Sequence, residues 1–375
     1  MTQEPNIFPY IARLLQDAEV VWKPLGEVAE LKRGTTITKK TSNEGIYPVI
    51  SGGQQPAYYI DQFNRDGETI TIAGSGAYAG FVMYWNEPIF VGDAFSVKAD
   101  EKQVLPRFIY HFLLSIQEKI HDLKSGGGVP HVYAKDVARF VIPLPPLSVQ
   151  QEIVRILDKF TQLEAELEAE LDCRKRQYEY YRNKLLTFND IGGGTEIVWK
   201  TLGEVLDIYT GGEAPKNLIR GERPQGSFIY PIYSNGEEIY GFTDNYRINK
   251  DAVTISSIGA KTGTIYFRKA YFTPIIRLKV LVPKNEKTLN SRYVFHYLSN
   301  ITISTKRSSV PNINANEVKS IKIPLPPLEE QQRIATILDK FDILVNSISE
   351  GLPKEIALRR KQYEYYRERL LSFPS

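Results

Sequence analysis

Two long segments of the chain carry apolar residues at helical spacing among charged residues. The first series runs from Ile153 to Leu185 and the second from Ile334 to Leu370, mostly in steps of three and four. Such steps place a narrow apolar stripe along a helix, a pattern typical of a coiled coil. We expect a nearly straight first helix from about Ser148 to Leu186, which would span roughly 60 Å at ~1.5 Å per residue.

The second series contains an interruption. Gly351 and Pro353 lie inside it, and the offset between the two series grows by four residues between Leu338 and Tyr363. Proline removes a backbone donor, and glycine readily adopts conformations outside the helix. The sequence therefore predicts a kink or a short break near the middle of the second helix.

A narrow apolar stripe needs another helix to cover it. The nearest candidate is the other long helix of the same chain, and two halves related by a two-fold axis would place the helices antiparallel. The alternative is that each helix packs only on its own domain. The charged run Glu164–Glu170 favours the paired arrangement.

Shorter elements precede each long helix. Segments rich in β-branched and aromatic residues, separated by glycine turns, predict strands. In the first half these are Thr69–Ala73 and Phe81–Trp85, and a short helix is predicted over Phe108–Leu114. Their counterparts in the second half are Ala252–Ser256, Thr264–Phe267 and Tyr293–Leu298.

The sequence contains an internal repeat. Three blocks of residues recur in the same order with a shift of about 180 residues. Val21–Val28 returns as Val198–Val205, Ile142–Leu147 as Ile323–Leu328, and Gln177–Arg182 as Gln362–Arg367. A period of this length indicates a duplicated domain. Two similar domains suit a partner that repeats along an axis, as duplex DNA does.

These patterns predict an α+β protein. We expect two similar mixed α/β domains joined by two long helices that form an antiparallel coiled coil, with pseudo-two-fold symmetry. The first domain is expected over residues 1–145 and its helix over 146–190, the second domain over 191–326 and its helix over 327–375.

Composition changes this picture little. Of the 375 residues, 42% are hydrophobic, which supports well-buried cores, and the net charge is only +3. That charge does not indicate nucleic acid unless basic residues gather on one face. The single Cys173 excludes an internal disulfide and a cysteine-based zinc site. The sequence shows neither a signal peptide nor a membrane-spanning stretch, so a cytoplasmic protein is expected.

No catalytic or metal-binding set is predicted. The loop Gly74–Gly80 lacks the glycine spacing of a nucleotide-binding loop, and its counterpart Ser257–Gly263 keeps only two of the glycines, so both are expected to be tight turns. His111 and His296 recur between aromatic residues, which favours repeated packing over chemistry. No Ser-His-Asp or Cys-His arrangement stands out.

The candidate functional residues lie on loops that mix basic, amide and aromatic side chains. Lys and Arg can neutralise phosphates, while Arg, Asn and Gln can read base edges. For any one residue a solvated loop is the alternative, but recurrence at matched loops in both halves favours a DNA interface. The first-half candidates are Arg33, Thr35, Lys39, Lys40, Gln54, Gln55, Tyr58, Tyr78, Lys124, Ser125, His131 and Tyr133. The second-half candidates are Lys216, Arg220, Arg223, Asn235, Lys261, Lys306, Arg307, Asn312 and Asn314.

Two proline-rich segments, and the first residues of the long helix that follows each of them, resemble segments of a known protein family. Ile142–Leu147 precedes Gln150–Ile153, and Ile323–Leu328 precedes Gln331–Ile334. Together with the duplicated plan, these segments resemble the specificity subunit of type I restriction-modification systems over nearly the whole chain.

The resemblance implies a function without catalysis in this chain. In that family each domain is a target-recognition domain that reads one half of a divided double-stranded DNA sequence, and the long helices act as a spacer. The helices also dock two modification subunits that methylate adenine, and restriction subunits join that core. S-adenosylmethionine, ATP and Mg are expected on the partner subunits. The resemblance places the subunit interface at Gln150, Gln151, Arg155, Arg176, Tyr180, Gln331, Gln332, Arg333, Lys361 and Tyr365.

Two other functions stay open at this stage. One is a self-contained DNA methyltransferase or nuclease, against which the missing catalytic motifs argue. The other is a coiled-coil scaffold that binds proteins, which would lack the steep salt dependence that phosphate contacts give to DNA affinity.

Overall fold

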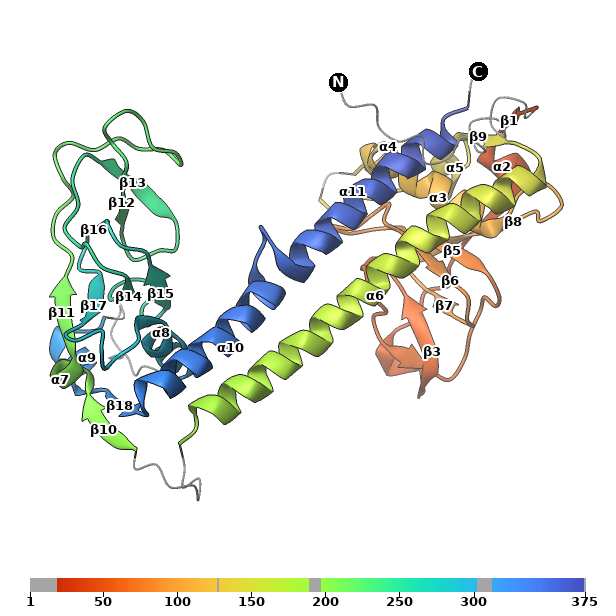
Figure 1. Ribbon diagram of the computed structural model, residues 1–375. Coiled ribbons are helices and arrows are strands. Elements are labelled where there is room, and N and C mark those ends of the chain that lie inside the picture. The colour runs from red at the N-terminus through yellow and green to blue at the C-terminus, as the bar shows by residue number, and fades with distance from the viewer. Residues whose placement is uncertain (1–18, 127, 189–196, 302–311, 374–375) are drawn as a thin grey trace. The chain divides into compact units, whose positions relative to one another are not determined.

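The computed structural model describes residues 19–126, 128–188, 197–301 and 312–373. The chain divides into two compact units (Figure 1). The first unit consists of Met1–Glu168 together with Glu355–Ser375, and the second unit is Ala169–Lys354. Each unit therefore combines one globular part with segments from both long helical regions.

The globular part of the first unit contains two main sheets. A four-stranded sheet has the order β2-β8-β5-β6, a three-stranded sheet has the order β4-β3-β7, and a separate ribbon pairs β1 with β9. The strands are β1 (Val21–Pro24), β2 (Ala29–Arg33), β3 (Glu44–Ile50), β4 (Tyr59–Ile60), β5 (Thr69–Ala73), β6 (Val82–Trp85), β7 (Phe90–Val91), β8 (Ala94–Ala99) and β9 (Val141–Leu144). The helices are α2 (Leu25–Val28), η1 (Lys39–Thr41), α3 (Pro106–Ser115), α4 (Gln117–Asp122) and α5 (Ala134–Val137). The long helices α6 (Leu147–Leu186) and α11 (Gly351–Leu371) each belong partly to both units.

The second unit repeats this topology. Its sheets have the orders β11-β17-β14-β15 and β13-β12-β16, with a ribbon of β10 and β18. The strands are β10 (Val198–Thr201), β11 (Leu206–Thr210), β12 (Tyr230–Tyr233), β13 (Ile239–Thr243), β14 (Ala252–Ile255), β15 (Ile265–Arg268), β16 (Thr273–Pro274), β17 (Lys279–Pro283) and β18 (Lys322–Leu325). The helices are α7 (Leu202–Val205), α8 (Ser291–Asn300), α9 (Ala315–Ser320) and α10 (Leu328–Asn346). The predicted strands and short helices are confirmed to within two residues of their ends.

The predicted tight turns join two antiparallel strands in each unit. The turn Gly74–Gly80 connects β5 to β6, and Gly76 and Gly80 both have positive φ. Gly259 and Gly263 have the same conformation between β14 and β15. Only glycine adopts this backbone conformation without strain, which explains why these two glycines are kept in the counterpart turn.

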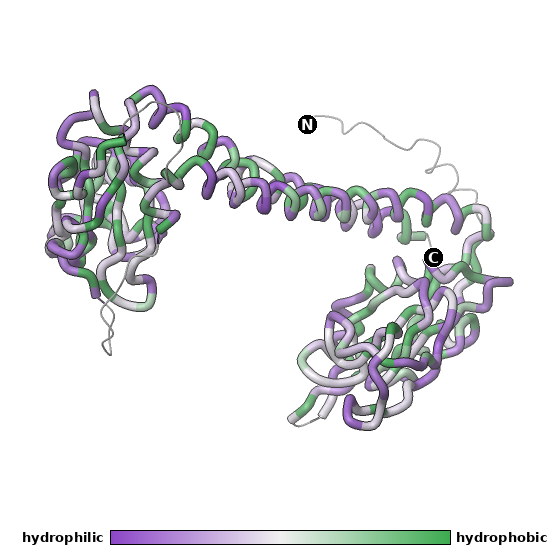
Figure 2. Tube along the Cα trace, turned by 90° about the horizontal axis from the view of Figure 1, so that it is seen from below, coloured by the Kyte–Doolittle hydropathy of each residue, from purple (hydrophilic) through white to green (hydrophobic). Residues whose placement is uncertain are grey.

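The predicted antiparallel pairing is confirmed in the first unit, where α11 runs beside α6 (Figure 1). Phe160 stacks on Tyr366 with ring centroids 5.2 Å apart, and Arg360 binds both Glu164 and Glu168. Residue numbers rise along α6 and fall along α11 through these contacts. Hydrophilic and hydrophobic residues alternate along the helices (Figure 2), as expected for helices that are buried on part of their surface.

The helices also pack on the globular parts. Ile153 and Leu157 of α6 lie in the core of the first unit, which also contains Leu370 of α11. In the second unit Phe341 of α10 stacks on Tyr178 of α6, at 6.0 Å between ring centroids. The two arrangements considered from the sequence therefore coexist, because each helix buries more than one narrow stripe.

The predicted break in the second long helix is confirmed. Helix α10 ends at Asn346 and α11 begins at Gly351, which has a φ of 73°. A Cβ on Gly351 would lie 2.4 Å from the carbonyl oxygen of Ile343. The bend thus requires glycine for its backbone angle and for the close approach of the preceding helix.

Replacing Gly351 with alanine is expected to lower the free energy of unfolding by about 1–3 kcal/mol, since the left-handed conformation and the clash both oppose a side chain. Chemical denaturation followed by circular dichroism would measure this. Gly236→Ala is the control, because its φ is not positive and a Cβ there meets nothing within 4 Å. Equal stability of the two variants would contradict the explanation.

Candidate nucleic-acid interface

In the first unit, loops from four parts of the sequence meet beside the end of β5. The backbone of Ser75 pairs with that of His131, and the hydroxyl of Ser75 donates a hydrogen bond to Asp93. Gly52 approaches Ser75 so closely that a Cβ would lie 2.5 Å from its carbonyl oxygen. Lys124 donates to the carbonyl of Ala77 at 3.3 Å.

We call the cluster formed by these loops the reading edge of the unit. A small cavity of about 60 Å³ lies within it. Arg33, Asp93, His131 and Tyr133 line it, and the rings of His131 and Tyr133 stack at 6.1 Å between centroids. Tyr78 is 48% exposed on the adjoining turn. The structure therefore brings together Arg33, Tyr78, Lys124, Ser125, His131 and Tyr133 from the sequence-predicted set.

The second unit forms a reading edge at the equivalent place. The backbone of Ile258 pairs with that of Asn312, just as Ser75 pairs with His131. The Asn235 side chain accepts a hydrogen bond from the amide of Ser257 at 2.7 Å and donates to the carbonyl of Ile276 at 2.6 Å. Lys261 is exposed on the turn between β14 and β15. Asn235, Lys261 and Asn312 thus belong to one edge.

Two strained residues, which sequence reasoning missed, lie at this edge. Ile276 and Arg277 have φ values of 52° and 59°, a region that non-glycine residues rarely occupy. Their amides donate to the carbonyls of Gly212 and Gly211 at 2.8 and 2.9 Å, and Ser257 donates to the carbonyl of Arg277. Strain held in place by surrounding hydrogen bonds is typical of functional loops.

The two edges differ in chemistry although their scaffolds match. The amide of Gly34 donates a hydrogen bond to the carbonyl of Ala94, and the amide of Gly211 donates to the carbonyl of Leu278. The residues that precede these two acceptors, Asp93 and Arg277, therefore hold equivalent positions. A carboxylate in one unit is therefore replaced by a guanidinium in the other. His131 and Asn312 are a second such pair.

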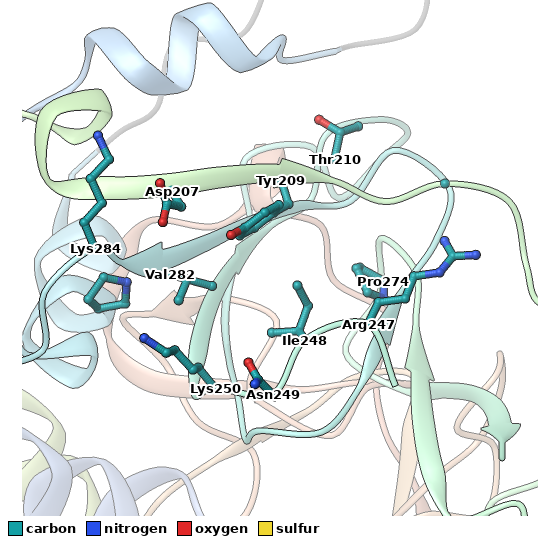
Figure 3. A pocket seen from close by; sticks show the side chains of 12 residues that line it. Asp207, Tyr209, Thr210, Arg247, Ile248, Asn249, Lys250, Pro274, Val282 and Lys284 are labelled. Carbon is teal, nitrogen blue, oxygen red and sulfur yellow. The ribbon is translucent and has the colours of Figure 1, made fainter. Parts of the chain in front are cut away.

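A larger pocket of about 310 Å³ opens in the second unit alongside β11 and β17 (Figure 3). Tyr209, Ile248 and Val282 give it apolar walls, and Arg247 lies at its edge. At the equivalent place in the first unit stands Arg65, since Arg65 pairs with Ile89 as Ile248 pairs with Phe272. The Arg65 guanidinium donates to Ser96 at 2.7 Å and to the carbonyls of Asn64 and Arg33. The units therefore also differ beside their reading edges.

Some predicted contact residues have structural partners instead. The hydroxyl of Tyr58 donates to the carbonyl of Ile37 at 3.0 Å, and its half-buried ring packs on the core beneath β3. Asn314 is the N-cap of α9 and accepts hydrogen bonds from the amides of Asn316 and Glu317. Both side chains therefore have structural roles in their own units, and their contact with DNA stays a prediction.

The remaining predicted contact residues that the structure describes are exposed, and Lys39 and Lys40 among them lie on η1. Arg220 stacks on Tyr240 at 4.6 Å. Thr35, Lys39, Lys40, Gln54, Gln55, Lys216 and Arg223 are exposed. Lys306 and Arg307 lie outside the described residues.

The predicted subunit-interface set contains two side chains that are buried in their own units. Gln150 is fully buried, donates to the carbonyls of Gln103 and Pro145 and accepts from the amide of Leu105. Gln331 makes the corresponding contacts in the second unit. The burial of both side chains contradicts a direct contact with a partner. Each side-chain amide already forms hydrogen bonds with the backbone of the segments that precede its helix. The others are exposed on the helices: Gln151, Arg155, Arg176, Tyr180, Gln332, Arg333, Lys361 and Tyr365.

Each unit also contains a charged clamp between its globular part and a long helix. In the first unit Asp158 of α6 accepts hydrogen bonds from Arg107 and, at 2.7 Å, from His111 of α3. The other ring nitrogen of His111 lies 2.9 Å from the hydroxyl of Tyr363 on α11. A neutral imidazole satisfies both contacts by donating to the carboxylate and accepting from the phenol.

The clamp recurs in the second unit, where Asp339 accepts from Arg292 and from His296 at 2.6 Å. The sequence predicted that the two histidines are packed, and both are buried, but it missed their carboxylate partner. Two features of the sequence could have predicted this contact. An arginine precedes the histidine by four residues in both halves, and an aspartate stands at matched positions of the long helices.

Burial lowers the pKa of His111, while its contact with Asp158 works in the opposite direction. Burial also disfavours the charged form of Asp158, but hydrogen bonds from His111 and Arg107 hold the pKa of that carboxyl below its usual value. The phenol of Tyr363 is buried, which raises its pKa to about 12. The clamp thus consists of a carboxylate, a guanidinium and a neutral imidazole near neutral pH.

Lowering the pH from about 7.5 to 5.5 is expected to destabilise wild-type protein more than a His111→Asn variant. The unfolded histidine binds its proton near pH 6.5 but folded His111 only at lower pH, so protons favour the unfolded state in this window. The contribution of Asp158 is lost only below its usual pKa, outside the window. Urea unfolding of both proteins at the two pH values checks this, and equal losses would contradict it.

The described residues hold no further site of a familiar kind. Within residues 19–126, 128–188, 197–301 and 312–373, no three His, Cys, Asp or Glu side chains are grouped so that they could hold a metal ion. Every described helix is too short or too polar to span a lipid bilayer.

Comparison with known proteins places the chain in a family. The model of the type I restriction modification DNA specificity domain matches residues 18–172 and again residues 196–358. A type I restriction enzyme specificity subunit of Escherichia coli is 33% identical over 97% of this chain and 97% of its own length. A second, the EcoprrI specificity subunit of Escherichia coli, is 28% identical over 91% of this chain and 92% of its own length.

Comparison of structures agrees with this assignment at the level of the fold. The crystal structure of the S subunit of a type I restriction-modification system from M. genitalium has a TM-score of 0.71 and 20% sequence identity. The match covers 96% of this chain and 98% of that chain. The chain therefore belongs to the family of type I restriction-modification DNA specificity subunits.

Proposed function

We propose that each unit reads one part of a divided DNA target through its own reading edge, and that the long helices set the distance between the two parts. In this account residues 1–145 and 191–326 are the two target-recognition domains. The helices also dock two modification subunits, which carry S-adenosylmethionine, while this chain contributes recognition and no catalysis. ATP and Mg belong to restriction subunits that join the same complex.

The observation that carries this proposal is the pair of unlike edges on like scaffolds. Asp93 and Arg277 hold equivalent positions, as do His131 and Asn312. A carboxylate accepts hydrogen bonds from cytosine, whereas a guanidinium donates two to guanine. Two edges of this kind read two different base sequences, which fits a target with unlike halves.

Single substitutions at the two edges are expected to affect separate halves of the target. Arg277→Asn removes the charge and tolerates the left-handed backbone, so only the bases read by the second unit should lose preference, by about 1–3 kcal/mol per contact. Asp93→Ala should change only the other half. The measurement is selection of bound duplexes from a random pool by the complex with its modification subunits, followed by sequencing.

Lys269→Ala is the matched control for lost positive charge. The Lys269 side chain is 83% exposed, and its ammonium already pairs with Asp251. This variant should keep the base preferences of the wild type. If Arg277→Asn weakened binding to all sequences equally, Arg277 would contact only phosphates, and the proposed reading role would be wrong.

A further inference from the structure

Each unit presents an exposed tryptophan on its two-stranded ribbon. Trp22 of β1 lies opposite Pro143, and Trp199 of β10 lies opposite Pro324 in the same register. Trp22 is 42% exposed and Trp199 is 50% exposed. The preceding valine of each strand is also exposed. Large apolar side chains that recur on a surface in this way indicate an interaction site.

The two ribbons carry the same side chains at the start of their first strands, whereas the two reading edges carry different ones. Val21–Lys23 and Val198–Lys200 have identical sequences. A pair of surfaces that reads two unlike base sequences must differ, as Asp93 and Arg277 do. A pair of surfaces that stays alike fits a ligand that is presented twice in the same form. The ribbons therefore point to two identical copies of one partner.

The surroundings of Trp22 show what kind of partner would fit. A groove of about 470 Å³ lies beside it in the first unit. Phe112, Phe140, Pro143 and Leu371 give the groove apolar walls, and the exposed side chains of Lys119 and Glu368 add one charge of each sign. An apolar protein surface with polar groups at its edge complements such a site, because it would cover the exposed indole and the apolar walls.

We infer that the two ribbons are docking sites for two copies of one protein chain, each of which covers one tryptophan. This inference rests on the proposed function, in which that chain is the modification subunit. Part of the subunit interface, which the sequence placed on the long helices, would then lie on the ribbons at Val21–Pro24 and Val198–Thr201. The burial of Gln150 and Gln331 agrees with this move, because the helix openings contribute fewer free side chains than the sequence predicted.

The test is the stoichiometry of the complex formed with the modification subunit of the same system, measured by native mass spectrometry. The wild-type chain should bind two copies. Trp22→Ala and Trp199→Ala should each bind one copy tightly and the other at least about 10-fold more weakly. The double variant should bind neither copy tightly. Tyr59→Ala, which removes a 53% exposed aromatic ring elsewhere in the first unit, should still bind two.

Three results would overturn the inference. The first is a double variant that still binds two copies with wild-type affinity. The second is a fall in the melting temperature of the isolated chain with unchanged stoichiometry, which would make the tryptophans part of the internal packing. The third is self-association of the isolated chain that both tryptophan substitutions abolish. Failure of the proposed function is distinct, since it would appear as a wild-type complex that binds two copies but lacks any sequence preference on DNA.

Discussion

Alanine in place of Asp158 is expected to destabilise the first unit by about 2–3 kcal/mol. Removing one partner of a fully buried ion pair costs ~3–5 kcal/mol, but the Asp158 side chain is 36% exposed, so solvent reduces the loss. The remaining cost arises because the completely buried ring of His111 keeps a donor without an acceptor.

Arg107 would also lose its counter-charge in this variant. Its guanidinium lies over the rings of Tyr84 and Tyr110, at 4.3 and 5.0 Å from their centroids. Those contacts orient the guanidinium toward α6, and they remain when the carboxylate is removed. Helix α6 would therefore lose its polar contacts with α3, while the apolar contacts of Ile153 and Leu157 in the core remain.

Hydrogen exchange measured by mass spectrometry can assign the loss to one unit. Asp158→Ala should reduce protection in α3 and in the adjoining part of α6, and Asp339→Ala should do the same for α8 and α10. Asp172→Ala is the surface control, because its ion pair with Arg176 is exposed and worth ~0–1 kcal/mol. Equal effects of Asp158→Ala and Asp172→Ala would show that the clamp does not hold the domain.

Lengthening both helices together is expected to change the spacing of the DNA target and leave the bases read by each unit unchanged. One heptad would be inserted after Glu168 and one after Lys354, because these are the boundaries between the two units. Both insertions would leave the contacts within each unit unchanged. Seven residues add ~10 Å at ~1.5 Å per residue, or at most about 3 base pairs at ~3.4 Å each. A heptad also keeps the apolar stripe of each helix in register.

Selection of bound sequences from random duplexes would reveal the new spacing. The same two blocks of bases should return with a longer gap between them. A control in which the two heptads consist of glycine and serine should bind weakly and without a defined gap, because a flexible linker sets no fixed distance. An unchanged gap in the helical variant would mean that the helices do not set the spacing.

The sequence predicted those parts of the fold that depend on local pattern and repetition. Helix α6 was recognisable from its apolar steps, and the break before α11 from Gly351 and Pro353. The turn at Gly74–Gly80 followed from the wrong glycine spacing for a nucleotide site. Each of these features is determined by residues close together in the chain, so periodicity and backbone preference were sufficient.

The parts that could not be predicted depend on contacts between distant residues. Asp158 lies 51 residues from Arg107, and no local pattern distinguishes it from a surface carboxylate. The family resemblance implied a subunit interface at Gln150, but the tertiary fold buries this side chain, which donates to the backbone carbonyl of Gln103. Arg277 was missed because its importance follows from a strained backbone and from its equivalence to Asp93, which only strand register reveals.

The most direct test of the central claim is the sequence bound by the wild-type complex, obtained by selection from random DNA and sequencing. Two short blocks of fixed bases, unlike each other and separated by a gap of constant length and random sequence, are the predicted result. A single continuous block, or binding without sequence preference, would contradict the assignment of one reading edge to each unit.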